Sequence, residues 1–508
     1  MRQDAHRYVW LKGCMKKSII QLTGGNFLSK LLGGLREVLT AACFGTGATA
    51  GAYRVAQTGT LVPVNFFTSD SLNAAFIPLY KRYLVESPDK AIVLLWEILG
   101  LFTLLSVAIG YGLAVLAPLW VETLAPGLGS VAMTTAVELL RVMALGVPFY
   151  LWSMIFIFQA MAHDDFVPMA LRPSVQNLGM IAGVLLAYFT GHVSWLAWGF
   201  TASYMGLFGW SLYRAVVTRS LRWPETWQRG ELREVARAFW LTLRPLLLLP
   251  VMLQGNIVTE RAVASMISLT AVAAIDYSRF VTETIILLLA MPIAYVGLSS
   301  WSVLGREALD RQLRRVTMLL LLIAVPGSLF LYDNAVSIVD VVYARGAFDA
   351  VSSTTTAAIL QGAAIGLWAQ VVGYVLIKAL NAKMRNRQVL WIMAAALFGN
   401  VMTNLLLYRW LGAWTLGLGN AVYGLLLFLG TVWACGLAKS ILRYLPILAV
   451  ACCGYLLCGQ WIPAPDHELS RLFCNALFAA IYWSIVVLVI PAFRQCIVDL
   501  VRQRKVRS

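Results

Sequence analysis

The sequence is poor in charged residues. Only 13% of its 508 residues are Asp, Glu, Lys or Arg, whereas a soluble protein carries about a quarter. Hydrophobic residues make up 60%, and the mean hydropathy is +0.75. Apolar runs of roughly 20 residues recur from end to end, each long enough to cross ~30 Å of hydrocarbon. Because lipid offers the backbone no hydrogen bonds, these runs must be helices. The scarcity of charge therefore excludes a soluble globular protein and predicts an all-α polytopic membrane protein.

The sequence also lacks patterns typical of metal or disulfide chemistry. Its eight cysteines include no Cys-x-x-Cys pair, and its four histidines are widely scattered. We therefore expect no metal and no cofactor, while H⁺ and Na⁺ both remain open as coupling ions. A cleavable signal peptide is not expected either, because Lys30, Arg36 and Glu37 interrupt the first apolar run.

The net charge of +16 does not indicate nucleic-acid binding. Basic segments alternate with connections that carry few Lys or Arg residues, which is the positive-inside pattern of membrane proteins. The basic segments are 1–17, 214–237, 306–315, 378–387, 439–443 and 494–507. This alternation predicts about fourteen transmembrane helices with both termini in the cytoplasm.

The same alternation of basic and sparsely basic segments divides the chain into four parts. We predict an N-lobe over residues 1–213, a cytoplasmic basic amphipathic linker over 214–238 and a C-lobe over 239–437. Residues 438–508 would add two C-terminal spans and a basic tail. A tyrosine and a nearby arginine recur in GAYRVAQT (51–58) and IDYSRFVT (275–282). This favours two pseudo-symmetric lobes of about six helices each around a central cavity, as in transporters.

One otherwise apolar stretch, Gln254–Glu283, contains several charged residues. It contains Glu260, Arg261, Asp276, Arg279 and Glu283. A charge at the bilayer centre costs between ~3 and ~15 kcal/mol, so these residues must line a wet cavity or pair inside the bundle. The last three are spaced i, i+3, i+7 and share one helix face.

Several motifs, in order along the chain, resemble the MviN/MurJ family of the multidrug/oligosaccharidyl-lipid/polysaccharide exporter superfamily. They are SKLLGGLRE (29–37), LNAAFIP (72–78), LAPGLG (124–129), VPMALRPSVQNLGMI (167–181), TERAVAS (259–265), DYSRF (276–280) and RGAFD (345–349). The resemblance implies a flippase in the bacterial inner membrane. Such proteins carry an undecaprenyl-pyrophosphate-linked glycan, such as lipid II, from the cytoplasmic to the periplasmic leaflet, and proteins of cell-wall or polysaccharide synthesis would be its partners.

The resemblance also implies which residues bind the substrate. Arg36 and Arg279 match cavity arginines that engage the pyrophosphate, and Lys30 lies where the family often has arginine. Arg54 and Asn65 in the second span are further candidates. The expected charge partners of these residues are Glu37, Asp276, Glu283, Glu260 and Arg261.

Departures from the family pattern leave alternatives open. Lipid II transporters typically carry arginine where this chain has Val64 and Asn65, so an exopolysaccharide or O-antigen repeat-unit flippase is a rival. A drug exporter of the same superfamily would have a more apolar and acidic cavity. A membrane glycosyltransferase or polymerase would need a larger outward loop than this chain offers, and a scaffold would not need charges at bilayer depth.

Overall fold

The computed structural model describes residues 24–68, 70–218, 221–224, 227–461, 465, 467–491 and 493–494. The chain forms two compact units, unit 1 (Met1–Ala262) and unit 2 (Val263–Ser508), and the boundary falls inside helix α11 (Leu248–Ile267). The predicted basic segments at the two ends of the chain lie outside the described residues, apart from Arg494.

The described residues form helices and turns, without a strand. The all-α class predicted from the sequence is therefore confirmed. Within these residues, seven helices are long and apolar enough to cross a membrane, or nine if each of two bent helix pairs is one span. The number of about fourteen transmembrane spans remains a prediction.

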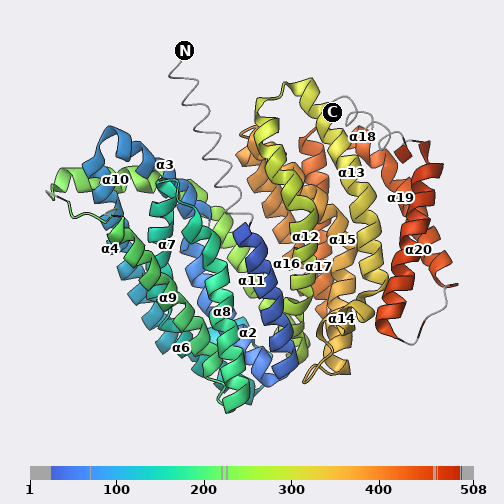
Figure 1. Cartoon of the computed structure of the whole chain (residues 1–508), viewed down its shortest axis with the longest axis horizontal. Helices are drawn as coiled ribbons and strands as arrows, with labels where there is room; N and C mark the ends of the chain where they lie inside the picture. Colours follow the sequence, from blue (N-terminus) through green and yellow to red (C-terminus); the bar gives the residue numbers. More distant parts are fainter. Residues whose placement is uncertain are drawn as a thin grey trace. The chain divides into compact units, whose positions relative to one another are not determined.

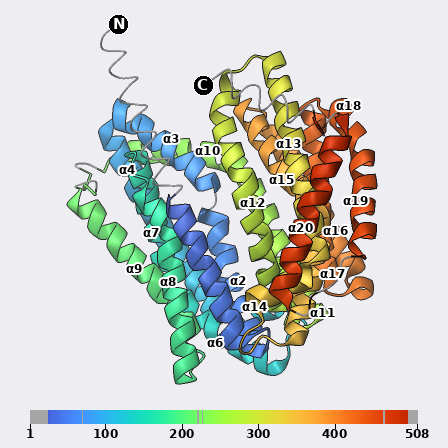
Figure 2. The same cartoon turned by 45° about the vertical axis from the view of Figure 1, so that its right-hand side comes forward.

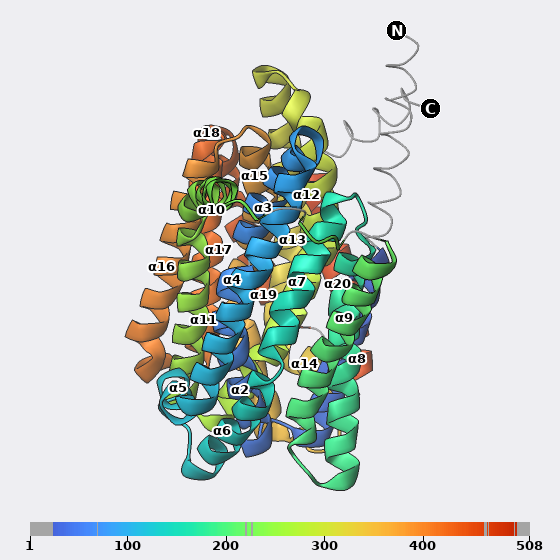
Figure 3. The ribbon, with the colours of Figure 1, turned by 90° about the vertical axis from the view of Figure 1, so that its left-hand side faces the viewer.

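Unit 1 begins with a helix over residues 24–44. The helices that follow are α2 (Ala48–Thr68), α3 (Asp70–Glu86), α4 (Pro88–Val115), α5 (Ala117–Leu124), α6 (Ser130–Ala144), α7 (Val147–Ala162), α8 (Val167–Thr190), α9 (Trp195–Val217) and α10 (Arg229–Leu243). Helix α2 packs on α6, α4 packs on α7, and α8 packs on α9 (Figure 3). Small residues allow this last pair to approach closely, since a Cβ on Gly183 would lie 2.6 Å from the Trp195 carbonyl oxygen.

Helix α10 is the amphipathic part of the predicted linker. It crosses the direction of its neighbours at one end of unit 1 (Figure 1) and packs on α3 and α4. Val235 and Phe239 are buried on its inner face, and the Lys90 ammonium donates to Glu234 Oε1 at 2.7 Å. An apolar face against the bundle and a polar face away from it are what an interfacial helix requires.

Unit 2 is built around one deeply buried helix, α15 (Ala350–Ala382). It packs on α12 (Leu269–Val303), α13 (Arg306–Asp333) and α17 (Trp414–Ala434). The other helices are α14 (Ala335–Tyr343), α16 (Asn386–Leu411), α18 (Ala438–Ile441), α19 (Leu445–Gly459) and α20 (Glu468–Val489). Figure 2 shows α20 at the front of the unit beside α19, and both helices contact α13.

The break between α11 and α12 lies at Ser268. The sequence predicts one continuous apolar stretch over Gln254–Glu283, whereas the structure divides it between two helices. The Ser268 hydroxyl oxygen accepts a hydrogen bond from the Ala271 amide at 3.1 Å, so it caps the N-terminus of α12. Glu260 and Arg261 therefore lie on α11, whereas Asp276, Arg279 and Glu283 lie on α12.

Candidate functional site

Three charged residues of unit 1 meet between its first two helices. Glu37, on the helix over residues 24–44, accepts a hydrogen bond from Arg36 Nη2 at 2.5 Å and forms an ion pair with Arg54 of α2. The side chains of Glu37 and Arg54 are each 3% exposed, and that of Arg36 is 18% exposed. We call Arg36, Glu37 and Arg54 the arginine–glutamate cluster. Its most accessible charge is Arg36.

The arginine–glutamate cluster is tied to a distant helix. Arg36 Nη1 donates to Asn177 Oδ1 of α8 at 2.9 Å and lies 3.3 Å from Met180 Sδ. The Asn177 amide in turn donates to the Ser29 carbonyl at 3.0 Å. Two arginines share one carboxylate, so the three side chains together carry one positive charge. Such a cluster can attract an anion without leaving an unpaired acid.

A second polar group in unit 1 was missed by the sequence analysis. Arg172 of α8 places Nη1 3.3 Å from the Tyr150 hydroxyl and 2.9 Å from Met154 Sδ. The Tyr150 hydroxyl also donates to Asn65 Oδ1 at 3.2 Å, so Asn65 of α2, a predicted site residue, belongs to this group. Arg172 lies inside the motif VPMALRPSVQNLGMI, and its charge within an apolar helix was the signal available. We call Arg172, Tyr150 and Asn65 the Arg172 group.

Two tyrosine hydroxyls are buried near these charges. Tyr53 and Tyr204 are each 1% exposed, and neither hydroxyl has a hydrogen-bond partner among the described residues. Tyr204 lies within electrostatic range of both Arg36 and Arg172, and Tyr53 lies within range of Arg36, Glu37 and Arg54. Buried polar atoms without partners are uncommon and call for an explanation.

The other predicted site residues of the first helix and of α11 are enclosed to different degrees. Lys30 is half-buried on the helix over residues 24–44. Glu260 and Arg261 are each 5% exposed on α11. Both members of this acid–base pair are thus withdrawn from water, as a charge at bilayer depth requires.

The solvent exposure of the predicted acid–base–acid face increases toward Glu283 along α12. Asp276 and Arg279 are half-buried, whereas Glu283 is exposed. The neighbouring Tyr277 is fully buried, and its carbonyl accepts a hydrogen bond from the Tyr343 hydroxyl of α14 at 3.1 Å. This contact ties α12 to α14 within unit 2, two residues before Arg279.

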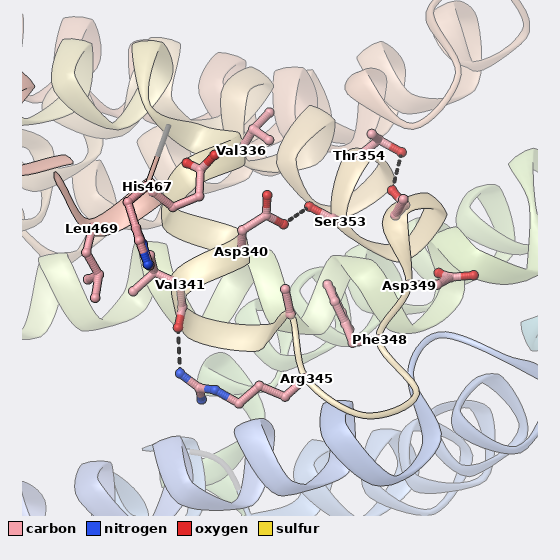
Figure 4. Close-up of a pocket in the computed structure, with 13 residues that line it drawn as sticks. Val336, Asp340, Val341, Arg345, Phe348, Asp349, Ser353, Thr354, His467 and Leu469 are labelled. Atoms are coloured by element: carbon pink, nitrogen blue, oxygen red, sulfur yellow. Dashed lines mark hydrogen bonds between the residues drawn. The ribbon is translucent and has the colours of Figure 1, made fainter. Parts of the chain in front are cut away.

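A cavity of about 630 Å³ lies at one end of unit 2, and no predicted site residue lines it (Figure 4). It is bordered by Asp340 of α14, the turn at Arg345–Asp349 and His467 before α20. Its charged groups already stabilise the turn. Arg345 Nη2 donates to the Val341 carbonyl at 2.7 Å, and Asp340 accepts a hydrogen bond from Ser353. Hydrogen bonds from Ser352 lower the pKa of Asp349, which caps α15.

Comparisons with known proteins identify the family. The family model described as "Lipid II flippase MurJ" matches residues 40–456. A probable lipid II flippase MurJ of Rhizobium tropici is 26% identical over 444 residues, 80% of this chain and 78% of that protein. One of Thermotoga maritima is 30% identical over 192 residues, 36% of this chain and 38% of that protein. A solved lipid II flippase MurJ in an inward closed conformation shares the fold with a TM-score of 0.77 and 20% identity, covering 92% of this chain and 98% of that one. The chain is a helical membrane protein that belongs to the lipid II flippase MurJ family.

Proposed function

We propose that this chain moves lipid II, a glycan linked to an undecaprenyl diphosphate, from the cytoplasmic to the periplasmic leaflet of the bacterial inner membrane. The observation that carries the proposal is the arginine–glutamate cluster, buried within a chain whose residues 40–456 match the family. A transporter that accepts a diphosphate needs positive charge inside its helical bundle, since the anion cannot enter hydrocarbon unescorted. In this reading the chain works as a transporter rather than as an enzyme.

The proposed binding step begins at Arg36. Its side chain is the most exposed of the cluster, and its Nη1 donates to Asn177 Oδ1 at 2.9 Å. A phosphate of the substrate would take over donors that now bind Glu37, while Arg54 keeps Glu37 neutralised. The exchange replaces one charge-assisted hydrogen bond with another, so no charge is left unpaired inside the bundle.

Arg279 is the proposed contact in unit 2. It is half-buried on α12, with Asp276 and Glu283 on the same helix. Its planar fork of donors suits phosphate oxygens. An alternating-access cycle would let arginines of the two units act on the substrate in turn, and H⁺ or Na⁺ could drive the cycle.

The substrate is tested by comparing ligands on the purified protein with native mass spectrometry. Wild-type protein should bind lipid II at least about tenfold more tightly than undecaprenyl monophosphate or a neutral polyprenol, as expected for the loss of charge-assisted hydrogen bonds. Equal binding of the neutral polyprenol would refute diphosphate recognition. Stronger binding of an undecaprenyl-diphosphate-linked exopolysaccharide repeat unit than of lipid II would replace lipid II by that rival substrate.

Orientation in the membrane is a separate prediction. We expect both termini and α10 to be cytoplasmic and the turn at Arg345 to face the periplasm, because the flanking loops follow the positive-inside pattern. In a variant without other cysteines, Arg345→Cys should react with an impermeant maleimide added from outside. Arg387→Cys, which lies at an exposed position in the opposite connection, is the matched control and should react only after the membrane is permeabilised. The reverse pattern would refute the orientation.

A further inference from the structure

Arg172 is a cation inside unit 1 without an acidic partner. No carboxylate among the described side chains forms an ion pair with it, and its polar contacts are a hydroxyl oxygen and a thioether sulfur. Arg36 and Arg54 differ from it, because both are paired with Glu37. A positive charge at bilayer depth that lacks a counter-ion in the protein is unfavourable unless it faces a water-filled cavity or binds an anion.

One edge of the Arg172 guanidinium makes no hydrogen bond to the described residues. Its Nη1 faces Tyr150 and Met154, whereas Nε is buried and has no hydrogen-bond partner among the described residues. Nη2 makes no hydrogen bond to described residues either, so the edge formed by Nε and Nη2 retains its donors. This edge is the fork with which arginine binds phosphate through two parallel hydrogen bonds.

Tyr150 links Arg172 to α2, the helix that also carries Arg54. Tyr150 is 5% exposed, and its hydroxyl links Arg172 to Asn65. The unpartnered hydroxyl of Tyr204 lies within electrostatic range of both Arg172 and Arg36. Along α8, Arg172 is five residues before Asn177, the residue that holds Arg36, and this spacing corresponds to about 7.5 Å of helix.

We propose that the Arg172 group is a second anion-binding site in unit 1 that takes one phosphate of the lipid-linked diphosphate, while Arg36 takes the other. The proposal rests on the proposed function and adds to it a preference for diphosphate over monophosphate. The arginine–glutamate cluster carries one net positive charge, and Arg172 supplies another. A diphosphate joined to carbon at both ends carries one negative charge on each phosphate, so two separate cations match it. A monophosphate presents a single phosphate group, so it cannot place one phosphate on each cation.

The test measures a preference rather than activity. Native mass spectrometry would compare lipid II, undecaprenyl monophosphate and phosphatidylglycerol on wild-type protein, Arg172→Gln and the control Arg141→Gln. Arg141 also lies in unit 1 and donates to a carbonyl, that of Ala114, at an exposed position. Arg172→Gln should lose about tenfold or more of the preference for diphosphate over monophosphate and keep its monophosphate binding. Arg141→Gln should keep both.

Other outcomes overturn the proposal. Wild-type preference in Arg172→Gln would make Arg172 a structural residue and leave the proposed function intact, whereas no preference in the wild type would remove the proposed function as well. If Arg172→Gln keeps the preference for diphosphate over monophosphate but binds phosphatidylglycerol more weakly than wild type does, the site is assigned to a membrane lipid. If Arg172→Gln does not fold, Arg172→Lys decides. It keeps the charge without the fork and should lose part of the preference.

Discussion

Glu37→Gln should sharply reduce the amount of folded protein in the membrane. The substitution keeps the size of the side chain but removes the carboxylate that binds both Arg36 and Arg54, and Arg54 is 3% exposed. Breaking a buried ion pair from one side costs about 3–5 kcal/mol, because it leaves an uncompensated charge. This is a large share of a typical total stability of about 5–15 kcal/mol. Thermal unfolding of purified protein, followed by size-exclusion chromatography, measures the effect.

Two further variants show whether charge is the cause. Glu37→Gln combined with Arg54→Gln removes the acid and its most buried base together, so folded protein should return. Glu86→Gln removes an exposed partner of Arg82 on α3 and should change stability by less than about 1 kcal/mol. An unfolding temperature of Glu37→Gln equal to that of wild type would contradict the role given to the buried carboxylate.

Arg279→Ala should leave folded protein in the membrane and lower flipping by about two orders of magnitude. This is the loss expected when a bidentate charge-assisted contact worth up to ~3 kcal/mol is removed. Arg279→Lys keeps the charge without the planar fork and should lower flipping by about tenfold. Reconstituted vesicles containing labelled lipid II would report the rate, and protein level would be measured in the same samples.

Controls distinguish substrate binding from pairing within the helix. If Arg279 only neutralises Asp276 and Glu283, Arg279→Ala should lower folded protein, and neutralising both acids should restore it. Arg409→Ala, at an exposed position near the end of α16 where the arginine contacts Tyr408, should leave flipping unchanged. Wild-type flipping by well-folded Arg279→Ala would eliminate Arg279 as a phosphate contact.

Sequence alone was sufficient to predict the helical membrane class and to select the charged residues at bilayer depth. Both depend on local properties, namely the length of apolar runs and the high cost of a charge inside them. The break between α11 and α12 was not evident from the same local properties. Ser268 terminates one helix and caps the next, but serine is common in apolar runs and does not by itself predict a break.

Pairing among the charges was decided by the tertiary structure. Glu37 binds Arg54 across 17 residues, and Arg36 binds Asn177 across 141 residues. Arg172 contacts Tyr150 only because α7 and α8 pack with these faces together, and Asn65 joins them from α2. The spacing of residues along one helix fixes which side chains share its face, but packing between helices decides which faces meet. The sequence therefore determined that charges lie within the membrane, and the fold determined that Arg172 stands apart from the acid that pairs with Arg36 and Arg54.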